Sequence, residues 1–266
     1  MRALLVYGFL VLAGCSSGLP IDTRHTAAGQ SSRVQYVVLH YTSADLARSL
    51  DLLTQGEVSA HYLINDSPPH VYRLVDEDRR AWHAGDSEWQ GRTWLNASTL
   101  GIELINPGYE EDAEGNRHWK PYPPEQIETL IRLLKELVRR HELPPGSIIG
   151  HSDIAPQRKV DPGPLFPWYR LAQEGLIPWP DDAQVALRQR LFASVGLPAP
   201  LWFQERLARL GYRVPLNGEL DEQTTRVLAA FQIKYRPSRY DGVPDAETAA
   251  LLQVLAPAQR IEVGER

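Results

Sequence analysis

Residues 148–164, IIGHSDIAPQRKVDPGP, constrain the fold more than any other stretch of this chain. The apolar pair at the start predicts the end of a buried strand, and Pro156, Pro162 and Pro164 rule out a continuous helix after it. We therefore expect a stiff, shaped loop at the rim of a sheet. Such a loop can hold an imidazole and a carboxylate as a pair, which suits Zn²⁺.

The candidate residues in this loop are His151, Lys159 and Asp161. Two ligands are too few for a catalytic zinc site, so the loop alone leaves two interpretations open. In one, His151 and Asp161 bind a metal together with a ligand from elsewhere in the chain. In the other, His151 caps a strand while Lys159 pairs with Asp161 at the surface.

A possible third ligand lies in residues 36–41, YVVLHY. This β-branched and aromatic run predicts a central strand with His40 at its end. A histidine in an apolar strand is more often a hydrogen-bonded core residue than a ligand. His40 becomes a ligand candidate because the loop around His151 supplies a partner site.

Residues 100–106, LGIELIN, predict another strand in which Glu103 has apolar neighbours on both sides. A carboxylate there is costly to bury unless it meets a cation, a metal-bound water or hydrogen-bond donors. Glu103 is therefore a candidate general base. Residues 82–85, WHAG, predict an exposed loop of the kind that lines a sugar or peptide groove, although Trp82 can equally belong to the core.

The remaining pattern before residue 180 alternates between strands and helices. Strands are expected at residues 59–65 and 71–75, a short amphipathic helix at residues 44–53, and a longer one whose apolar positions run from Ile127 to Val138. This order predicts an α/β layer fold with a central sheet and its site at one rim.

The N-terminus has the layout of a secretory signal. The apolar run of residues 3–14 is too short to span a bilayer, and the LAGC at its end resembles a bacterial lipobox, in which Cys15 is lipidated. Cys15 is the chain's one cysteine, which excludes a disulfide framework and a thiolate metal site. We expect residues 1–14 to be a signal peptide and residues 15–32 a flexible tether.

The last third of the chain, residues 181–266, predicts helices. Residues 218–224, GELDEQT, and 242–248, GVPDAET, repeat one helix-start signal, with Asp as N-cap and Thr at N3. Together with residues 203–212 they predict a small three-helix domain. Such a unit can bind a partner, or it can be a helical cap that packs on the first domain.

Taken together, His40, His61, residues 82–85, residues 101–103 and residues 151–163 resemble the zinc-dependent N-acetylmuramoyl-L-alanine amidases of the type 2 amidase family. The resemblance implies a central mixed sheet flanked by helices, as in peptidoglycan-recognition proteins, with residues 33–180 as the catalytic domain. It also implies hydrolysis of the amide between N-acetylmuramic acid and L-alanine in peptidoglycan or muropeptides. Residues 181–266 resemble the peptidoglycan-binding type 1 domain.

Position by position, the resemblance implies that His40, His151 and Asp161 bind one Zn²⁺ per chain. Three protein ligands leave the fourth tetrahedral position for water, as in hydrolytic sites. The family's catalytic acid falls on Glu103 and its lysine on Lys159. The additional candidates for substrate binding are His61, which we interpret as shaping the pocket, and Trp82, His83 and Asn106.

The same resemblance gives expectations for partners and location. Ser16 after Cys15 favours an outer-membrane lipoprotein that faces the periplasm, with peptidoglycan and muropeptides as partners. The formal net charge of −5 gives no indication of a nucleic-acid surface, and we expect a monomer.

Two other functions remain open. A non-catalytic peptidoglycan-binding lipoprotein could use the same fold, but such recognition proteins typically lack part of the metal site. Here His40, His151, Asp161 and Glu103 are all present, which favours the enzyme. A zinc peptidase acting within the stem peptide would use similar chemistry and differ in the bond that it breaks.

Overall fold

The computed structural model describes residue 19 and residues 21–257, so the predicted signal peptide and Cys15 lie outside the described residues. The chain separates into residues 1–31 and residues 32–266. The described residues of the first part are exposed and contain neither helix nor strand. No helix within the described part of the chain is long and apolar enough to cross a bilayer.

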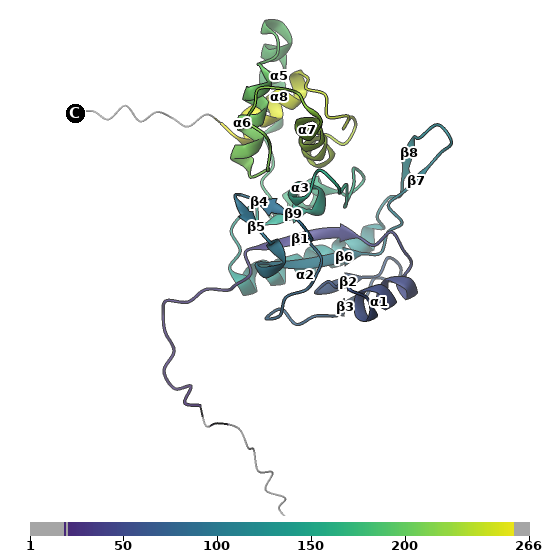
Figure 1. The fold of residues 1–266 in the computed structure, drawn as a ribbon, viewed down its shortest axis with the longest axis vertical. Helices are drawn as coiled ribbons and strands as arrows, with labels where there is room; N and C mark the ends of the chain where they lie inside the picture. Colours follow the sequence, from purple (N-terminus) through teal and green to yellow (C-terminus); the bar gives the residue numbers. More distant parts are fainter. Residues whose placement is uncertain (1–18, 20, 258–266) are drawn as a thin grey trace, which may run out of the picture. The chain divides into compact units, whose positions relative to one another are not determined.

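A five-stranded mixed sheet forms the centre of residues 32–266, in the order β3-β2-β6-β1-β9 (Figure 1). Its strands are β1 (Tyr36–Tyr41), β2 (Tyr62–Ile64), β3 (Val71–Arg73), β6 (Thr99–Leu104) and β9 (Ile148–Gly150). β1 pairs in parallel with β6 and β9, β2 pairs in parallel with β6, and β3 is antiparallel to β2. The predicted mixed sheet is confirmed.

Smaller elements surround this sheet. Two short hairpins, β4–β5 and β7–β8, lie outside it. The bounds of these elements are β4 (Glu88–Trp89), β5 (Arg92–Thr93), the 3₁₀ helix η1 (Leu95–Ala97), β7 (Tyr109–Glu111), β8 (Arg117–Trp119), α1 (Leu46–Gln55) and α4 (Trp168–Gln173).

One face of the sheet is covered by α2 (Pro124–His141). Its apolar residues follow the helical period, so that Ile127, Leu130 and Leu134 lie on one stripe and pack in the same core as Val37 and Leu39 of β1. Pro124 occupies the first turn, where its missing N–H is not needed, and three basic residues occupy the last turn. The predicted scaffold helix is confirmed.

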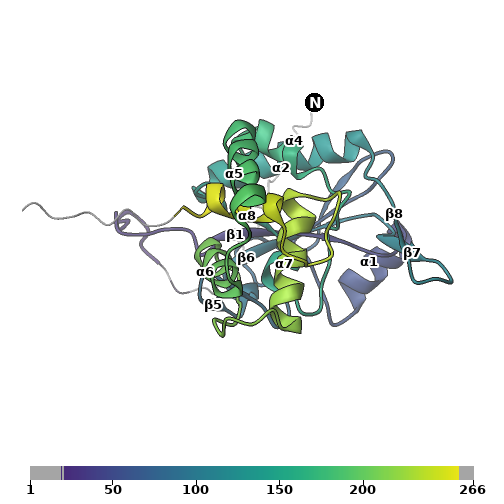
Figure 2. The ribbon, with the colours of Figure 1, turned by 90° about the horizontal axis from the view of Figure 1, so that it is seen from above.

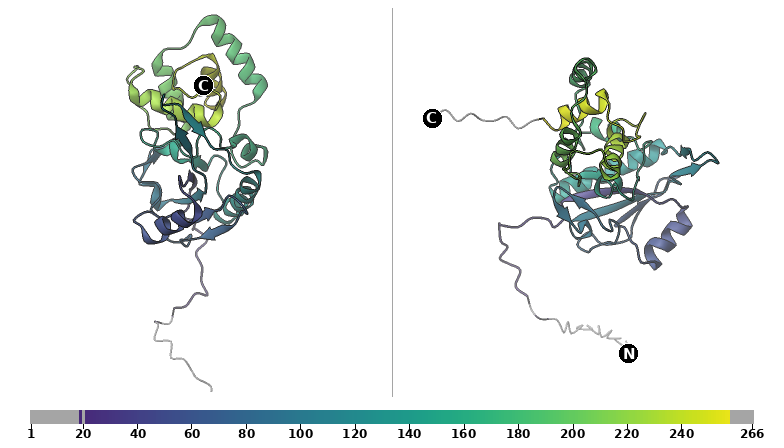
Figure 3. Two further views of the ribbon diagram at one scale, coloured as in Figure 1. Left: turned by 90° about the vertical axis from the view of Figure 1, so that its right-hand side faces the viewer. Right: turned by 45° about the horizontal axis from the view of Figure 1, so that its top comes forward.

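The other face is covered by helices from the end of the chain, α6 (Pro200–Leu210), α7 (Glu222–Tyr235) and α8 (Ala246–Leu255). The preceding helix α5 (Asp182–Val195) packs against α8. Seen from above, α6, α7 and α8 lie over β1 and β6 (Figure 2), and Figure 3 shows the same layering from two other directions. Tyr36, Val38 and Ile149 of the sheet pack in one apolar core with Phe203 and Phe231 of these helices. The helices and the sheet therefore share a core.

The predicted three-helix unit corresponds to α6, α7 and α8, and α5 precedes it. Both predicted helix starts are present, because Asp221 accepts from the backbone N–H of Thr224 at 2.7 Å and Asp245 accepts from that of Thr248 at 2.8 Å. Each cap satisfies a backbone donor that the first helical turn leaves free.

Each helix start is also held by a buried glutamine. The Gln204 amide donates to the backbone carbonyl of Glu219 at 2.8 Å and to the Thr224 hydroxyl at 2.9 Å, and its oxygen accepts from the N–H of Gly218 at 2.8 Å. Gln232 repeats this arrangement with Val243, Thr248 and Gly242. The two glutamines thus fasten the two loops that precede α7 and α8.

We expect Gln204→Ala to lower the free energy of unfolding by about 2 kcal/mol, because it leaves buried backbone and hydroxyl groups without partners. Urea unfolding measures this difference. The matched control is Gln189→Ala, on the exposed side of α5, which should change the free energy by less than about 0.5 kcal/mol. Equal effects of the two substitutions would contradict the fastening role.

Candidate active site

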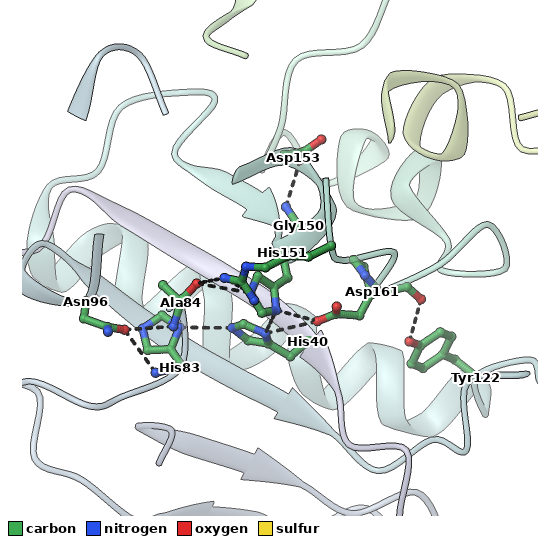
Figure 4. A network of polar contacts seen from close by, with 11 residues as sticks. His40, His83, Ala84, Asn96, Tyr122, Gly150, His151, Asp153 and Asp161 are labelled. Atoms are coloured by element: carbon green, nitrogen blue, oxygen red, sulfur yellow. Dashed lines mark hydrogen bonds and ion pairs between the residues drawn. The ribbon is translucent and has the colours of Figure 1, made fainter. Parts of the chain in front are cut away.

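Three side chains from separate parts of the chain meet at the end of β1. The Nδ1 atoms of His40 and His151 lie 3.0 Å apart, and the Oδ2 atom of Asp161 lies 3.1 Å from the first and 3.0 Å from the second. All three residues are buried. Figure 4 shows His40 between His83 on one side and Asp161 on the other.

The sheet itself brings the two histidines together. Leu39 of β1 pairs with Gly150, the last residue of β9, so His40 of β1 and His151, which directly follows β9, lie at the same edge. The register of β1 with β6 also places His40 directly beside Glu103. Directly paired residues of neighbouring strands project from the same face of a sheet, and the strands are about 4.8 Å apart. The side chains of His40 and Glu103 are therefore close together on one face.

A helical turn, α3 (His151–Ile154), begins where the sequence predicts a loop. Asp153 closes this turn by accepting from the backbone N–H of Gly150 at 2.8 Å. The N–H of Ser152 donates to the backbone carbonyl of Asp161 at 2.8 Å. This short turn therefore connects two of the three converging residues. The loop with prolines follows it, as expected.

A chain of hydrogen bonds sets the tautomer of His40. The Thr99 hydroxyl donates to the carbonyl of Leu95 at 2.7 Å, so it must accept from Nε2 of His83, 3.0 Å away. The neutral His83 ring then accepts at Nδ1 from Nε2 of His40, at 3.0 Å. The lone pair of His40 is left on Nδ1, which faces His151 and Asp161.

Gly101 makes room for this chain. A Cβ atom at this position would lie 2.4 Å from the His83 ring. The ring therefore lies against the backbone of β6, beside Thr99 and within reach of His40.

The ring of His151 contacts the loop of residues 82–85. Its Nε2 lies 3.3 Å from the carbonyl of Ala84 and 3.4 Å from the guanidinium of Arg158. In the tautomer that donates to this carbonyl, the lone pair is on Nδ1. The guanidinium of Arg158 also donates to this carbonyl, at 2.5 Å, and to the carbonyl of Asp86 at 2.8 Å. Gly85, at φ +57°, permits the close approach of the guanidinium.

These three atoms fit a metal ion. In the His151 tautomer that donates to Ala84, three lone pairs face one another at 3.0 to 3.1 Å and repel unless a cation lies among them. In a tetrahedral zinc site with bonds of about 2.0 to 2.1 Å, ligand atoms lie about 3.3 Å apart, close to the observed separations. His40, His151 and Asp161 thus form a group that could hold a metal ion.

The protonation states agree with this fit. Burial lowers the pKa of His40 to about 4, with His151 adding to the effect, so the ring is neutral at pH 7. Burial opposes ionisation of Asp161, but His151 and His40 outweigh it and hold the pKa of its carboxyl well below the usual range. A neutral imidazole, as at His40, and an ionised carboxylate, as at Asp161, are forms that bind a metal.

The group lies in a pocket of about 380 Å³ that also contains Glu103 and Lys159. The Oε2 atom of Glu103 is buried and has no hydrogen-bond partner within the described residues. Burial raises the pKa of Glu103 to about 8, the nearby Asp161 adds to the shift, and Lys159 opposes it. A carboxyl group in this state can exchange a proton near neutral pH.

The additional substrate-binding candidates lie in different places. Trp82, 50% exposed, and His83 both line the pocket. His61 is buried, accepts from the N–H of Gly101 at 3.0 Å and faces the carbonyl of Arg79 at 3.1 Å.

Asn106 uses both polar atoms on backbone groups of Gly108, Lys120 and Pro121. Substrate binding by His61 and Asn106 stays a prediction that these contacts do not favour.

Sequence reasoning missed several residues that hold this site. Thr99, Ala84 and Arg158 act through hydrogen bonds to the histidines or to the loop that contacts them. Ala84 contributes a carbonyl, which no side-chain pattern can indicate. Thr99 could have been noticed in the sequence, because it is a hydroxyl residue in an otherwise apolar strand, two positions before Gly101.

Two family models match the chain. The model described as N-acetylmuramoyl-L-alanine amidase matches residues 30–164, and the model described as putative peptidoglycan binding domain matches residues 198–252.

Curated relatives agree with these matches. The chain is 42% identical over 265 residues to the N-acetylmuramoyl-L-alanine amidase AmiD of Escherichia coli (strain K12), covering 94% of this chain and 95% of that protein. It is 44% identical over 100 residues to the 1,6-anhydro-N-acetylmuramyl-L-alanine amidase AmpD of Enterobacter cloacae, covering 38% of this chain and 48% of that protein.

Solved structures extend the similarity to the fold. The complex of AmiD from E. coli with the substrate anhydro-N-acetylmuramic acid-L-Ala-D-gamma-Glu-L-Lys matches with a TM-score of 0.80 at 41% identity, over 90% of this chain and 94% of that chain. AmpDh3 from Pseudomonas aeruginosa in complex with anhydromuramic pentapeptide matches with a TM-score of 0.82 at 38% identity, over 89% and 97% respectively.

The pKa of Glu103 predicts how stability depends on pH in metal-free protein. The unfolded chain loses this proton near pH 4.5 while the folded chain keeps it to about pH 8, so wild-type stability falls as pH rises through this window. Glu103→Gln removes this dependence. The variant should gain stability relative to wild type between pH 5 and pH 8, measured by urea unfolding with a chelator present.

The control is Glu110→Gln, because hydrogen bonding to Lys120 lowers the pKa of that exposed carboxyl. Glu110 is ionised throughout this range, so its substitution should give a difference that does not vary between pH 6 and pH 8. A pH-independent difference for Glu103→Gln as well would contradict the raised pKa.

Proposed function

We propose that this chain, which belongs to the N-acetylmuramoyl-L-alanine amidase family, works with one Zn²⁺ held by His40, His151 and Asp161. It hydrolyses the amide between N-acetylmuramic acid and L-alanine in peptidoglycan and its muropeptides. The observation that carries the zinc proposal is the convergence of three lone-pair atoms in the pocket that contains Glu103 and Lys159.

In this mechanism the chain binds the metal and moves the proton. Zn²⁺ supplies Lewis acidity and lowers the pKa of water to about 7. Glu103 holds a proton at its unpartnered Oε2 atom, first as the base that accepts it from the attacking water and then as the acid that gives it to the leaving amine. Lys159, a cation in the same pocket, stabilises the negative charge that develops on the carbonyl oxygen.

The tautomers set by the surrounding hydrogen bonds support this reaction. His83 accepts from Nε2 of His40, and Ala84 would accept from Nε2 of His151 when its Nδ1 is free for a metal. Arg158 fixes the loop that carries Ala84. Trp82 at the pocket rim offers an aromatic face to a sugar or peptide.

A non-catalytic wall-binding protein is the alternative on the same fold. Such a protein needs no proton carrier, yet this pocket contains a carboxyl group whose pKa is raised to about 8. Maintaining a buried carboxyl oxygen that has no hydrogen-bond partner among the described residues is unfavourable, so it indicates catalysis. A peptidase within the stem peptide would release a different product, which the assay below distinguishes.

The helical segment, residues 181–266, is proposed to bind peptidoglycan, in accordance with the family model that matches residues 198–252. Binding there would keep the pocket near its polymer and raise the local substrate concentration. Of the two predicted domains, residues 33–180 would then hydrolyse the substrate and residues 181–266 would bind the polymer.

The proposed location is the outer membrane, facing the periplasm, with a lipid on Cys15 and residues 15–32 as a tether. The support for it is the sequence alone: the apolar run that ends in LAGC, and the Ser, Thr, Gly and Ala content that follows. We propose a monomer.

We expect Glu103→Gln to retain zinc while turnover falls by about 10²- to 10⁴-fold, because the ligands remain and the proton carrier is lost. Mass spectrometry of purified muropeptides measures release of a stem peptide that begins with free L-alanine, and metal analysis measures zinc. A chelator should abolish release by the wild type. Zinc-loaded wild type that releases nothing from any muropeptide would favour the wall-binding alternative, and cleavage inside the peptide would indicate a peptidase.

We expect Cys15→Ser to move the protein from the membrane fraction to the soluble fraction of an expressing bacterium, because the acylated residue is lost. Ser17→Ala, a neighbouring change that leaves Cys15 and Ser16 intact, is the matched control and should stay with the membrane. Fractionation followed by immunoblotting checks both. Membrane association of Cys15→Ser equal to wild type would remove the lipid anchor from the proposal.

A further inference from the structure

A buried carboxylate connects the helical segment to the turn that carries His151. Asp153 of α3 is 1% exposed. Its Oδ1 atom accepts from the Tyr212 hydroxyl at 2.6 Å, and its Oδ2 atom lies 2.8 Å from the ammonium of Lys234. Lys234 belongs to α7 and Tyr212 lies two residues after the end of α6, so both donors come from the part of the chain that covers the second face of the sheet.

The same carboxylate shapes the candidate metal site. Its Oδ2 atom also accepts from the N–H of Gly150, which fixes the turn at the residue just before His151. The next residue of that turn, Ser152, donates from its N–H to the carbonyl of Asp161. A shift of Asp153 would therefore move two of the three proposed ligands.

The ion pair between Lys234 and Asp153 is energetically unfavourable as a means of joining two apolar surfaces. Lys234 is 6% exposed, and its ammonium also lies 4.3 Å from the centre of the Trp168 ring. Burying both charges loses hydration that apolar side chains of similar size would not need, and a buried pair fixes geometry more than it adds stability. Burial disfavours the charged form of Lys234, but the Asp153 carboxylate outweighs it and the pKa of Lys234 stays raised.

We propose that Lys234 and Tyr212 are positioning residues of the metal site, acting through Asp153, so that the helical segment takes part in holding zinc. This inference rests on the proposed zinc site. It gives the helices a role besides binding peptidoglycan, because they hold the turn from which His151 reaches the metal.

The test measures zinc affinity in the full chain by competition with a chromogenic chelator. Lys234→Met removes the charge and keeps the length of the side chain, and Tyr212→Phe removes one hydroxyl. We expect the zinc dissociation constant to rise about tenfold or more for Lys234→Met and several-fold for Tyr212→Phe, within the range seen when supporting contacts of metal ligands are lost.

The matched control is Arg236→Met. Arg236 is also buried beside α7 and pairs with Asp245 at 2.9 Å, but this pair lies within the helical segment and does not reach Asp153. The substitution Arg236→Met should lower the unfolding midpoint while leaving zinc affinity as in wild type. This control separates a general loss of stability from a change at the metal site.

The outcomes are distinct. If Lys234→Met and Tyr212→Phe are folded by circular dichroism and bind zinc as tightly as wild type, the positioning role is overturned. An equal loss of zinc affinity in Arg236→Met also overturns it. If Lys234→Met does not fold, Tyr212→Phe decides the question. A wild type that binds no zinc refutes the proposed metal site instead.

Discussion

The constraint on which this structure depends is the parallel register of β1 with its two neighbours. It places His40 beside Glu103 on one side and next to His151 on the other, so three residues from distant parts of the chain reach one pocket. The surrounding contacts hold the orientation of these side chains. A metal site needs both the strand register and these contacts. Strand pairing determines where the ligand residues lie, and hydrogen bonds determine which ring nitrogen carries the lone pair.

The sequence predicted what depends on local pattern. β1 and α2 lie where the residue types indicate them, because a β-branched run and a helical apolar stripe are each stabilised by burying a single face. The α/β layer fold with a central sheet followed from the order of these elements, and the mixed pairing of its strands from the family resemblance. Glu103 was recognised as unusual because a carboxylate between apolar neighbours is costly wherever the strand lies.

What the sequence did not predict depends on tertiary contacts. The turn α3 is four residues long, too short for a periodic signal, and it exists because Asp153 is held from three sides. The link from Thr99 through His83 to His40 joins residues that no spacing rule connects. The covering of the second sheet face by α6 and α7 was likewise open, since an apolar helix stripe does not reveal its partner.

The shared core has a consequence for how such a protein can be divided. Tyr36, Val38 and Ile149 are buried by the helices, so a shortened chain that stops before residue 181 would present the apolar face of its sheet to water. Such a fragment would tend to associate through that face. Genetic fusions or excised catalytic fragments of this architecture would therefore need polar replacements on the exposed strands, and a family member without the helices must carry a different surface there.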